Sequence, residues 1–596
     1  MRRRRSWSAC AAPSSRRASA RSSRSATRSS RRIPGPDPLA RQQVVNTSLG
    51  PERTITRSEE MKRNVVAMAV TGALVLAVAG CGGESDPSAP HETAPGFLAV
   101  ADQSATAEGP VTIQMGFDAS EVGGYDPQAA VNGQSWALYG LVYEPLVDVD
   151  ENFNVVPRLA SSWEQPDDTT YIFTIDTRAT FSNGRALTVD DVVGSLNRLR
   201  EGGTAWGAQV SSIASVTALD DQRVEVELSE PYTPLLAALA NNPASILPMK
   251  EVEAGEIDLA TEMLGTGPFV VKSHRQDKEW TFSRNAEYRN VKDVHITELQ
   301  VEIATNEATR QAALREGSIA MTTFSGVDAV RLLANSGASV YSQQQTDFFT
   351  LSMNSLRPGS PLADQDLRFA INAAVDRQAL SDAVFAGEAK ATGITPSNLP
   401  GACDPADLPS AQLSHQEIVD LVKSSGYAGE TLELVIYNSD PVLAQMAQVV
   451  QQQLDAVGVK VKIEQLDLAT FLARGQQSPA DLDMSLGALA GYSDAVMVSQ
   501  LWNSAAGLTA SFSQAHADLD ALIVQAAGQP ADETRAGILT DLCRTVDEYS
   551  DWVTLVHRPV VIGVNEDLLT IDLATDEGYN NVFRHLPTAR LTKAAD

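Results

Sequence analysis

The succession of strand, helix and strand between Leu432 and Ile463 constrains the fold of this chain more than any other feature. Leu432–Tyr437 has the composition of a strand. Leu443–Val457 shows the apolar spacing of an amphipathic helix, which Gly458 ends, and Val459–Ile463 is apolar at every second position. A helix between two strands is the connection that parallel strands require, so part of the sheet is expected to be parallel. We therefore expect a mixed α/β fold.

Further elements follow from alternation, apolar spacing and capping residues. Thr188 is expected to cap a helix that continues to about Arg200, and Gly317 stands where a C-cap is expected. Helical spacing also predicts helices over 305–316, 365–385 and 532–549. Strands are expected over 111–117, 171–176, 224–228, 280–283, 348–353 and 553–563.

The stretch from Met61 to Cys81 predicts export. Two basic residues, Lys62 and Arg63, precede an uncharged apolar run from Val65 to Val78, and small residues lead to Cys81. The run is shorter than the ~20 residues that a membrane span needs, which favours a signal peptide over a transmembrane helix. Its end resembles a bacterial lipobox. That resemblance implies cleavage before Cys81, a lipid on its thiol, and a chain anchored on the outer face of the cytoplasmic membrane.

The segments on either side of the signal are unlike a folded core. Residues 81–109 begin with a stretch rich in Gly, Ser, Pro and acidic residues, which is typical of a flexible tether. Residues 1–60 start with an Arg- and Ser-rich stretch that has no hydrophobic period. A nucleic-acid-binding arm and a twin-arginine signal are the alternatives there. We expect Met61 to be the initiator and residues 1–60 to be a mis-extended, disordered start.

Charge and length restrict the function of the part that follows the signal. Residues 1–80 contain 16 of the 46 basic and 4 of the 75 acidic residues, so the remainder has 30 basic and 71 acidic residues and a net charge of −41. Such a surface repels nucleic acid and anionic lipid headgroups. Roughly 500 residues exceed the ~250–300 at which a single core stops growing, so at least two lobes are expected.

Cys403 and Cys543 can form a disulfide in an oxidising compartment, although the sequence does not show that they are close.

A series of short blocks follows in a fixed order along the chain. The blocks are Tyr125–Pro127, Tyr143–Leu146, Val156–Ala160 with Ser162–Glu164, Phe181–Gly184 with Leu187–Thr188 and Asp190–Val192, Gly265–Phe269, Arg284–Asn285 with Tyr288, Glu307–Arg310, Asp366 with Arg368 and Ala370, Asp376–Arg377, and Gly426–Tyr427. Any one block is weak, but nearly ten in order are strong evidence. Together they resemble the extracytoplasmic solute-binding proteins, family 5, of bacterial ABC importers, which include oligopeptide-, dipeptide- and nickel-binding proteins. The resemblance extends from about Val111 to the C-terminus.

The resemblance implies a two-lobed clamshell of the periplasmic-binding-protein type, type II, in the large class with an extra subdomain and mixed sheets. Lobe one is expected over 110–349 and 556–596 and lobe two over 350–555, with the two crossovers as the hinge. Permease subunits and a cytoplasmic ATPase are the implied partners, besides a peptide or small-molecule ligand, and we expect a monomer. The chain itself has no P-loop.

Ligand residues are predicted from segments that line the cleft in relatives. Peptide-binding members often hold the peptide amine with an Asp, and Gly491 occupies the corresponding position here, while Asp494 matches the second Asp of that pattern. A small misalignment would allow Asp494 to bind the amine, and the alternative is a turn or cap. Further candidates, each with a structural alternative, are Tyr492, Asn354, Trp136, Tyr139, Phe348, Phe349, Trp502 and Arg558.

Catalysis and metal binding have little support in the sequence. It contains neither G-x-S-x-G nor H-E-x-x-H, and its seven histidines are scattered. We expect a binding protein and no enzyme, with no cofactor and no metal. The alternatives are a non-peptide ligand such as a sugar, an opine or a metal chelate, and an envelope sensor that does not transport. Turnover of peptides would be needed to support a hydrolase.

Overall fold

The structure is a computed structural model, and it describes residues 94–119, 124–130, 133–202, 204–333, 336–504, 509–578 and 581–593. Ser88–Asp596 forms one compact unit. The predictions for residues 1–60, for the signal sequence 61–80 and for Cys81 lie outside the described residues. Within the described ranges, every helix is too short or too polar to cross a bilayer.

The predicted tether, residues 81–109, does not extend to 109, because ordered structure begins before that residue. Phe97–Ala99 forms strand β1 and pairs antiparallel with β19 (Leu573–Ala574). Ala101 is buried, and its backbone N–H donates to Asp572 Oδ1 at 2.8 Å. The apolar residues of this stretch gain pairing and burial against the C-terminal part of the chain, which composition alone did not indicate.

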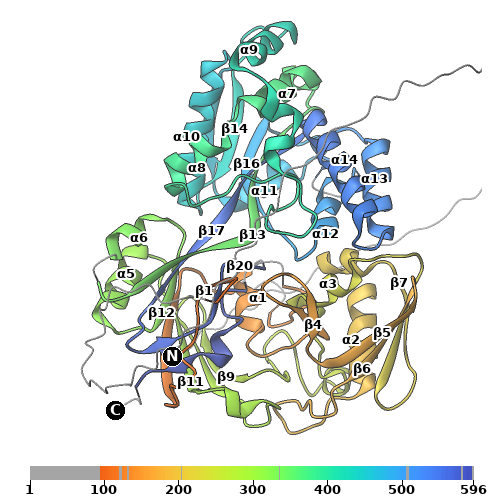
Figure 1. The fold of residues 1–596 in the computed structure, drawn as a ribbon, viewed down its shortest axis with the longest axis vertical. Coiled ribbons are helices and arrows are strands. Elements are labelled where there is room, and N and C mark those ends of the chain that lie inside the picture. The colour runs from red at the N-terminus through yellow and green to blue at the C-terminus, as the bar shows by residue number, and fades with distance from the viewer. Residues whose placement is uncertain are drawn as a thin grey trace, which may run out of the picture. The chain divides into compact units, whose positions relative to one another are not determined.

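An eleven-stranded mixed sheet runs through the compact unit (Figure 1). Its strands lie in the order β15-β14-β16-β13-β17-β12-β2-β11-β10-β9, and β20 pairs with β13 outside this path. Their bounds are β2 (Gly109–Met115), β9 (Phe269–Arg275), β10 (Glu279–Arg284), β11 (Ile296–Ile303), β12 (Met321–Phe324), β13 (Ser339–Met353), β14 (Leu432–Tyr437), β15 (Val461–Leu466), β16 (Met484–Leu489), β17 (Trp552–Val564) and β20 (Asp576–Glu577).

Smaller sheets and helices complete the fold. A four-stranded antiparallel sheet has the order β5-β6-β8-β7, with β5 (Ala160–Asp167), β6 (Thr170–Ile175), β7 (Ile213–Ala218) and β8 (Arg223–Leu228). The strands β3 (Val147–Val149) and β4 (Val155–Pro157) form one pair, and β18 (Leu569–Thr570) and β21 (Arg590–Leu591) form another. The α-helices are α1 (Gly133–Tyr139), α2 (Val189–Glu201), α3 (Leu235–Leu239), α4 (Met249–Ala254), α5 (Glu307–Glu316), α6 (Asp328–Leu333), α7 (Gln365–Ala374), α8 (Arg377–Phe385), α9 (His415–Ser424), α10 (Pro441–Ala456), α11 (Leu468–Gly475), α12 (Ala495–Ser499), α13 (Ala517–Gly528) and α14 (Glu533–Tyr549). The 3₁₀ helices are η1 (Ala205–Val210), η2 (Asn242–Ala244), η3 (Val291–Asp293), η4 (Pro361–Ala363), η5 (Pro405–Asp407), η6 (Pro409–Gln412), η7 (Gln500–Trp502) and η8 (Leu586–Thr588).

Two long strands connect two lobes that have separate cores. β13 and β17 pair antiparallel, and in Figure 1 they extend together from the lower group of elements into the upper one. Phe349 of β13 and Val553 of β17 belong to the core that contains Leu434 of β14, whereas Ile562 of β17 belongs to the core that contains Ile113 of β2. These strands therefore carry the chain between the lobes.

The predicted strand–helix–strand unit is confirmed. β14 and β15 pair in parallel, and α10 connects them. The predicted caps are also present. Thr188 forms a capping box with Asp191 at the start of α2, and Gly317 ends α5 in the left-handed conformation at φ 73°. Local polar side chains and glycine determine these helix ends, which is why the sequence predicts them well.

Two elements differ from the prediction. The helical stretch 365–385 is two helices, α7 and α8, because Val375 leaves the helical conformation and Asp376 caps the second helix through the backbone N–H of Ala379. The predicted strand 348–353 is only the end of β13, which starts at Ser339. The first half of this strand was not predicted, because residues Ser342–Thr346 are polar and do not alternate with apolar residues.

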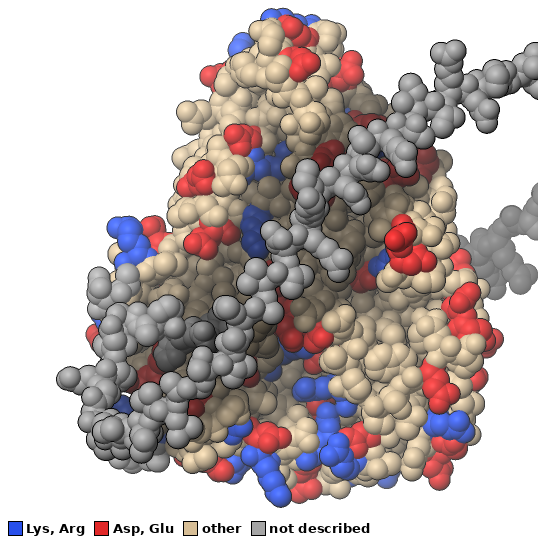
Figure 2. All heavy atoms as spheres, in the orientation of Figure 1, with Lys and Arg blue, Asp and Glu red and all other residues tan. Residues whose placement is uncertain are grey.

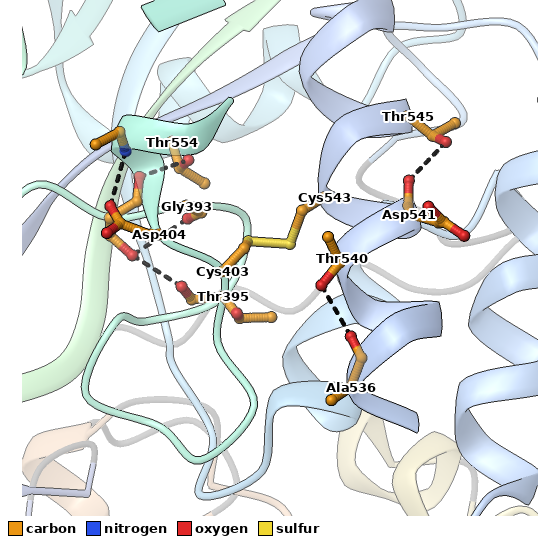
Figure 3. Close-up of a disulfide and its surroundings, with 12 residues drawn as sticks. Gly393, Thr395, Cys403, Asp404, Ala536, Thr540, Asp541, Cys543, Thr545 and Thr554 are labelled. Carbon is orange, nitrogen blue, oxygen red and sulfur yellow. Dashed lines mark hydrogen bonds between the residues drawn. A yellow bond between two sulfur atoms is a disulfide. The ribbon is translucent and has the colours of Figure 1, made fainter. Parts of the chain in front are cut away.

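Cys403 and Cys543 form a disulfide (Figure 3), with an S–S distance of 1.97 Å and Cα atoms 6.4 Å apart. Cys543 is buried on α14, and Cys403 lies in the segment between α8 and η5. A Cβ atom on Gly393 would lie 2.6 Å from Cys403 Sγ, so only glycine fits beside the bridge. The bridge therefore holds a segment that has little regular structure against a long helix.

The blocks that resemble the family stabilise the fold through buried ion pairs. Glu144 is fully buried, and its carboxylate accepts from Arg289 Nη1 at 2.6 Å and from Thr266 Oγ1 at 2.9 Å, with Arg158 Nε at 2.8 Å. Removing one partner of these ion pairs would leave an uncompensated buried charge. Outside these pairs, Asp and Glu are scattered over the face shown in Figure 2, with Lys and Arg among them.

Candidate functional site

A cavity of about 650 Å³ is lined by residues of both lobes and of the strands that connect them. From the first lobe come Met115–Phe117, which lie at and just beyond the end of β2, and Thr323–Ser325 at the end of β12. β2 and β12 are parallel neighbours, so their carboxyl ends lie at the same edge of the sheet. Crevices at the carboxyl ends of parallel strands are where open α/β sheets bind ligands.

The second lobe presents an equivalent edge to the same cavity. Tyr437 ends β14, and Ser439–Pro441 leads from it into α10. Gly487–Ala490 at the end of β16 and several residues of α11 complete this wall. Tyr437 and Phe471 meet edge to face with ring centroids 5.2 Å apart. Because strand ends of both lobes meet at one space, a solute there contacts both lobes at once.

Charged groups gather where β13 and β17 cross the cavity. Arg558 Nη2 lies 2.8 Å from Asp440 Oδ2, and Arg558 Nε lies 4.0 Å from Asp347 Oδ2. The guanidinium also stands over the ring of Phe349, 5.7 Å from its centroid. Asp440 is fixed further because its Oδ1 accepts from the backbone N–H of Val442 and caps α10.

Asp347 has an unusual environment for an acid. Burial, with a smaller contribution from the nearby Asp440, raises the pKa of its carboxyl to about 7, against the lowering effects of Arg558 and of its own backbone N–H. Its Oδ1 is buried and has no hydrogen-bond partner among the described residues. Buried polar groups are normally hydrogen-bonded, because an unpaired amide or hydroxyl costs roughly 2–7 kcal/mol to remove from water and an unpaired ionised carboxylate costs more. One carboxylate oxygen of a residue that lines the cavity is therefore left without a hydrogen-bond donor.

Of the residues predicted to contact ligand, Arg558 lines this cavity. The aromatic candidates pack in the cores instead. Trp136 and Tyr492 both meet Trp206 edge to face, at 5.4 and 5.3 Å. Tyr139 is fully buried and its hydroxyl donates to Gly124 O. The structure places Phe348 against Trp502, and Phe349 against Phe385.

Asn354 and Asp494 are held by structural interactions. Asn354 Nδ2 donates to the carbonyls of Ala480 and Leu482, and its Oδ1 accepts from two backbone N–H groups of the next turn. Asp494 Oδ1 caps α12, and Oδ2 accepts from Arg535 Nη2 at 2.5 Å. Neither residue lines the cavity. The alternative that the sequence left open for Asp494, a capping role, is the one that its contacts match.

Gly491, at the position of the expected amine-binding Asp, has no room for a side chain. A Cβ atom there would lie 1.5 Å from the carbonyl oxygen of Thr346 on β13. The loop after β16 therefore approaches the backbone of β13 directly, and only glycine permits this contact. A carboxylate that serves this cavity must come from another element.

Sequence reasoning missed Asp347 and Asp440, although each gives a signal. Asp347 precedes the apolar run Phe348–Met353 within one strand, where Asp is disfavoured. Asp440 precedes Pro441 between a strand and a helix, the position of an N-cap at the carboxyl end of a parallel strand. In the described ranges, no three His, Cys, Asp or Glu residues are grouped so that they could hold a metal ion.

Comparisons with known proteins agree with this architecture. The family model of the bacterial extracellular solute-binding proteins, family 5, matches residues 154–509, more than half of the chain. The "Probable D,D-dipeptide-binding periplasmic protein DdpA" of Escherichia coli K12 is 27% identical over 377 residues, which cover 61% of this chain and 71% of that protein.

Solved structures show the same fold at low identity. DppA of Helicobacter pylori, in complex with the peptide STSA, has a TM-score of 0.69 at 21% identity and covers 82% of this chain and 99% of its own. AgaA of A. tumefaciens, in complex with agropinic acid, has a TM-score of 0.70 at 21% identity, with 82% and 99% covered. The two-lobed α/β architecture of periplasmic binding proteins is thereby confirmed.

Proposed function

Because this chain belongs to the bacterial extracellular solute-binding proteins of family 5, we propose that it captures a peptide or a similar small organic solute between its lobes for an ABC importer. The cavity that both lobes line carries this proposal. The relative named for dipeptide binding and the complex of DppA with the peptide STSA support the peptide, and the agropinic acid complex supports a non-peptide solute as the second candidate. The close approach of Gly491 to β13 favours that candidate, because it removes the expected amine-binding Asp.

The lobes and the delivery step belong to the same proposal. We place lobe one at 110–349 and 556–596 and lobe two at 350–555, which the separate cores on either side of β13 and β17 support. The closed lobes would present one surface to the permease subunits. The chain would act as a monomer and as a binding protein without catalysis.

We propose that a lipid on Cys81 anchors the protein to the outer face of the cytoplasmic membrane. The signal-like stretch before Cys81 supports this anchor. Mass spectrometry of the mature N-terminus tests it. A lipid-modified peptide that starts at Cys81 is expected, and a mature chain that starts elsewhere would contradict the anchor.

Filling the cavity should abolish solute capture. Gly487 lines the cavity, and a Cβ atom there would point toward Tyr437 and Phe471, at 3.7 and 3.9 Å. The indole of Gly487→Trp would occupy the space in which a solute contacts both lobes. We expect the wild-type protein to retain components of a casein hydrolysate on a column, identified by mass spectrometry, and Gly487→Trp to retain none.

The matched control is Gly537→Trp, the same change on the exposed face of α14, where a Cβ atom has no neighbour within 4 Å. This variant should capture the same components as the wild-type protein. Equal capture by Gly487→Trp, with its fold verified by circular dichroism, would show that the solute binds elsewhere.

A further inference from the structure

Asp347 lies at the cavity and has one carboxylate oxygen without a hydrogen-bond donor. It lines the cavity from the middle of β13, and its side chain is only 8% exposed. Among the described residues, Oδ1 has no hydrogen-bond partner, and the charged atom nearest to Oδ2 is Arg558 Nε at 4.0 Å. A charged group this well buried is almost always paired in a native protein. Its partner is therefore to be sought in what the cavity holds.

Arg558 does not supply that partner. Its Nη2 forms an ion pair with Asp440 Oδ2 at 2.8 Å, although this contact does not have the geometry of a hydrogen bond. The distance from Nε to Asp347 is more than 1 Å longer than this. Two carboxylates thus share one guanidinium, and the cluster carries one excess negative charge when both acids are ionised. Such a cluster attracts a cation and disfavours an anion.

The walls around this charge are largely apolar and incompletely covered. Leu468 and Leu472 of α11 line the cavity and are 44% and 46% exposed. Phe117, which lines it from the first lobe, is 47% exposed. Exposed apolar side chains around one concave space are typical of a binding surface. A solute that covers them must have an apolar body.

We infer that Asp347 receives the positively charged group of the solute, and that this solute is an organic cation with an apolar body. The inference rests on the proposed function and narrows it. It assigns charge recognition to the strand that connects the lobes, and not to the loop of Gly491 and Asp494. An amine placed between Asp347 and the walls contacts both lobes, so its charge contributes directly to holding them together.

The first experiment compares two aspartates with one cationic probe. Phenethylammonium carries an amine on an aromatic body, and 2-phenylethanol is its neutral counterpart. At pH 8 we expect phenethylammonium at millimolar concentration to raise the melting temperature of the wild-type protein, with 2-phenylethanol having no effect. Asp347→Asn should bind phenethylammonium about ten- to hundredfold more weakly, the range expected for losing one charge-assisted hydrogen bond.

Asp494→Asn is the matched control, because it makes the same chemical change in the residue that the sequence proposed. It removes the negative charge that pairs with Arg535 and should lower stability, yet it should retain the affinity for phenethylammonium below its melting temperature. Retained affinity in Asp347→Asn, loss of affinity in Asp494→Asn alone, an equal effect of 2-phenylethanol, or no effect of phenethylammonium on the wild-type protein would each overturn the inference.

A second experiment separates this inference from the proposed function. A casein hydrolysate is offered to the wild-type protein before and after acetylation of its amines. Capture from the untreated hydrolysate only supports both proposals. Equal capture from both overturns the cation inference and leaves the binding function intact. Capture from neither, in a protein that phenethylammonium stabilises, contradicts peptide binding and supports a non-peptide cation.

Discussion

Replacing Asp347 with Asn should stabilise the ligand-free protein at pH 8, and the gain should disappear toward pH 4. The folded-state pKa of about 7 lies above the ordinary 3.8, so the folded protein holds a proton that the unfolded chain has released. The stability that this proton provides is complete below pH 3.8 and is lost as the pH rises through 7. The difference between the two pKa values corresponds to about 4 kcal/mol as an upper value. Asn has no charge to bury and avoids this loss.

Urea unfolding of both proteins from pH 4 to pH 9 checks this result. The groups that act on Asp347 are Arg558 from β17 and Asp440 from the start of α10, with Tyr437 nearby on β14. Burial raises the pKa of Tyr437, so its phenol stays neutral over this range. His557 of β17 is neutral over all but the acid end of this range, because burial lowers its pKa to about 4, and Glu577 of β20 pairs with Arg584. An Asn variant that is less stable than the wild-type protein at every pH would show that Asp347 is structural.

The sign of this effect distinguishes a binding residue from a structural one. Sites that hold unsatisfied groups reduce stability until a ligand satisfies them, so their removal stabilises the ligand-free protein and weakens binding. Asp494 should differ, because its carboxylate already caps α12 and pairs with Arg535. Asp347→Asn is thus expected to raise the stability of the ligand-free protein and weaken binding, whereas Asp494→Asn is expected to lower stability and leave binding unchanged.

Removing the disulfide should lower the free energy of unfolding by about 5 kcal/mol in the chain-entropy account, because the bridge closes a loop of 140 residues. The double variant Cys403→Ala/Cys543→Ala avoids a free thiol and leaves only a small change of volume. Urea unfolding of the oxidised wild-type protein and the double variant measures the effect. Neither cysteine lines the cavity, so affinity for a bound solute should not change.

Reduction of the wild-type protein provides the control for this experiment, because it opens the same loop without changing the sequence. The reduced protein and the double variant should have similar stabilities. A loss below 1 kcal/mol in both would show that the segment around Cys403 is held against α14 by packing, for which Leu399 and Leu408 are the available contacts.

The sequence predicts those parts of the fold that local chemistry determines. Thr188, Gly317 and Asp532 mark helix ends through their own side chains or backbone conformation, and the structure has helices that begin or end at each. The length of β13 was missed, because its first half is polar and is stabilised by pairing with β17. Pairing with a strand some 200 residues away leaves no mark on local alternation.

The candidate site was harder to predict, because its residues are brought together by the lobes. Arg558 was proposed from its place at the return crossover, and it does line the cavity. Asp347 and Asp440 lie far apart in the sequence, and the guanidinium of Arg558 stands between them only in the folded protein. Aromatic residues did not indicate where the cavity lies, because an aromatic residue in the sequence can pack in a core or line a cavity. Phe348 and Trp502 stack on each other in a core.

The most direct test of solute capture between the lobes is the melting temperature of the purified protein, refolded to remove bound solute, against di- to hexapeptides, their N-acetylated forms, sugars, opines and metal chelates. A ligand at about 100 times its dissociation constant stabilises by about 2.7 kcal/mol, which is readily measured. We predict that solutes with a free amine and an apolar body raise the melting temperature of the wild-type protein and that their acetylated forms do not. The same amines should not raise the melting temperature of Gly487→Trp. Stabilisation that persists in Gly487→Trp, or no stabilisation by any amine, would contradict the account.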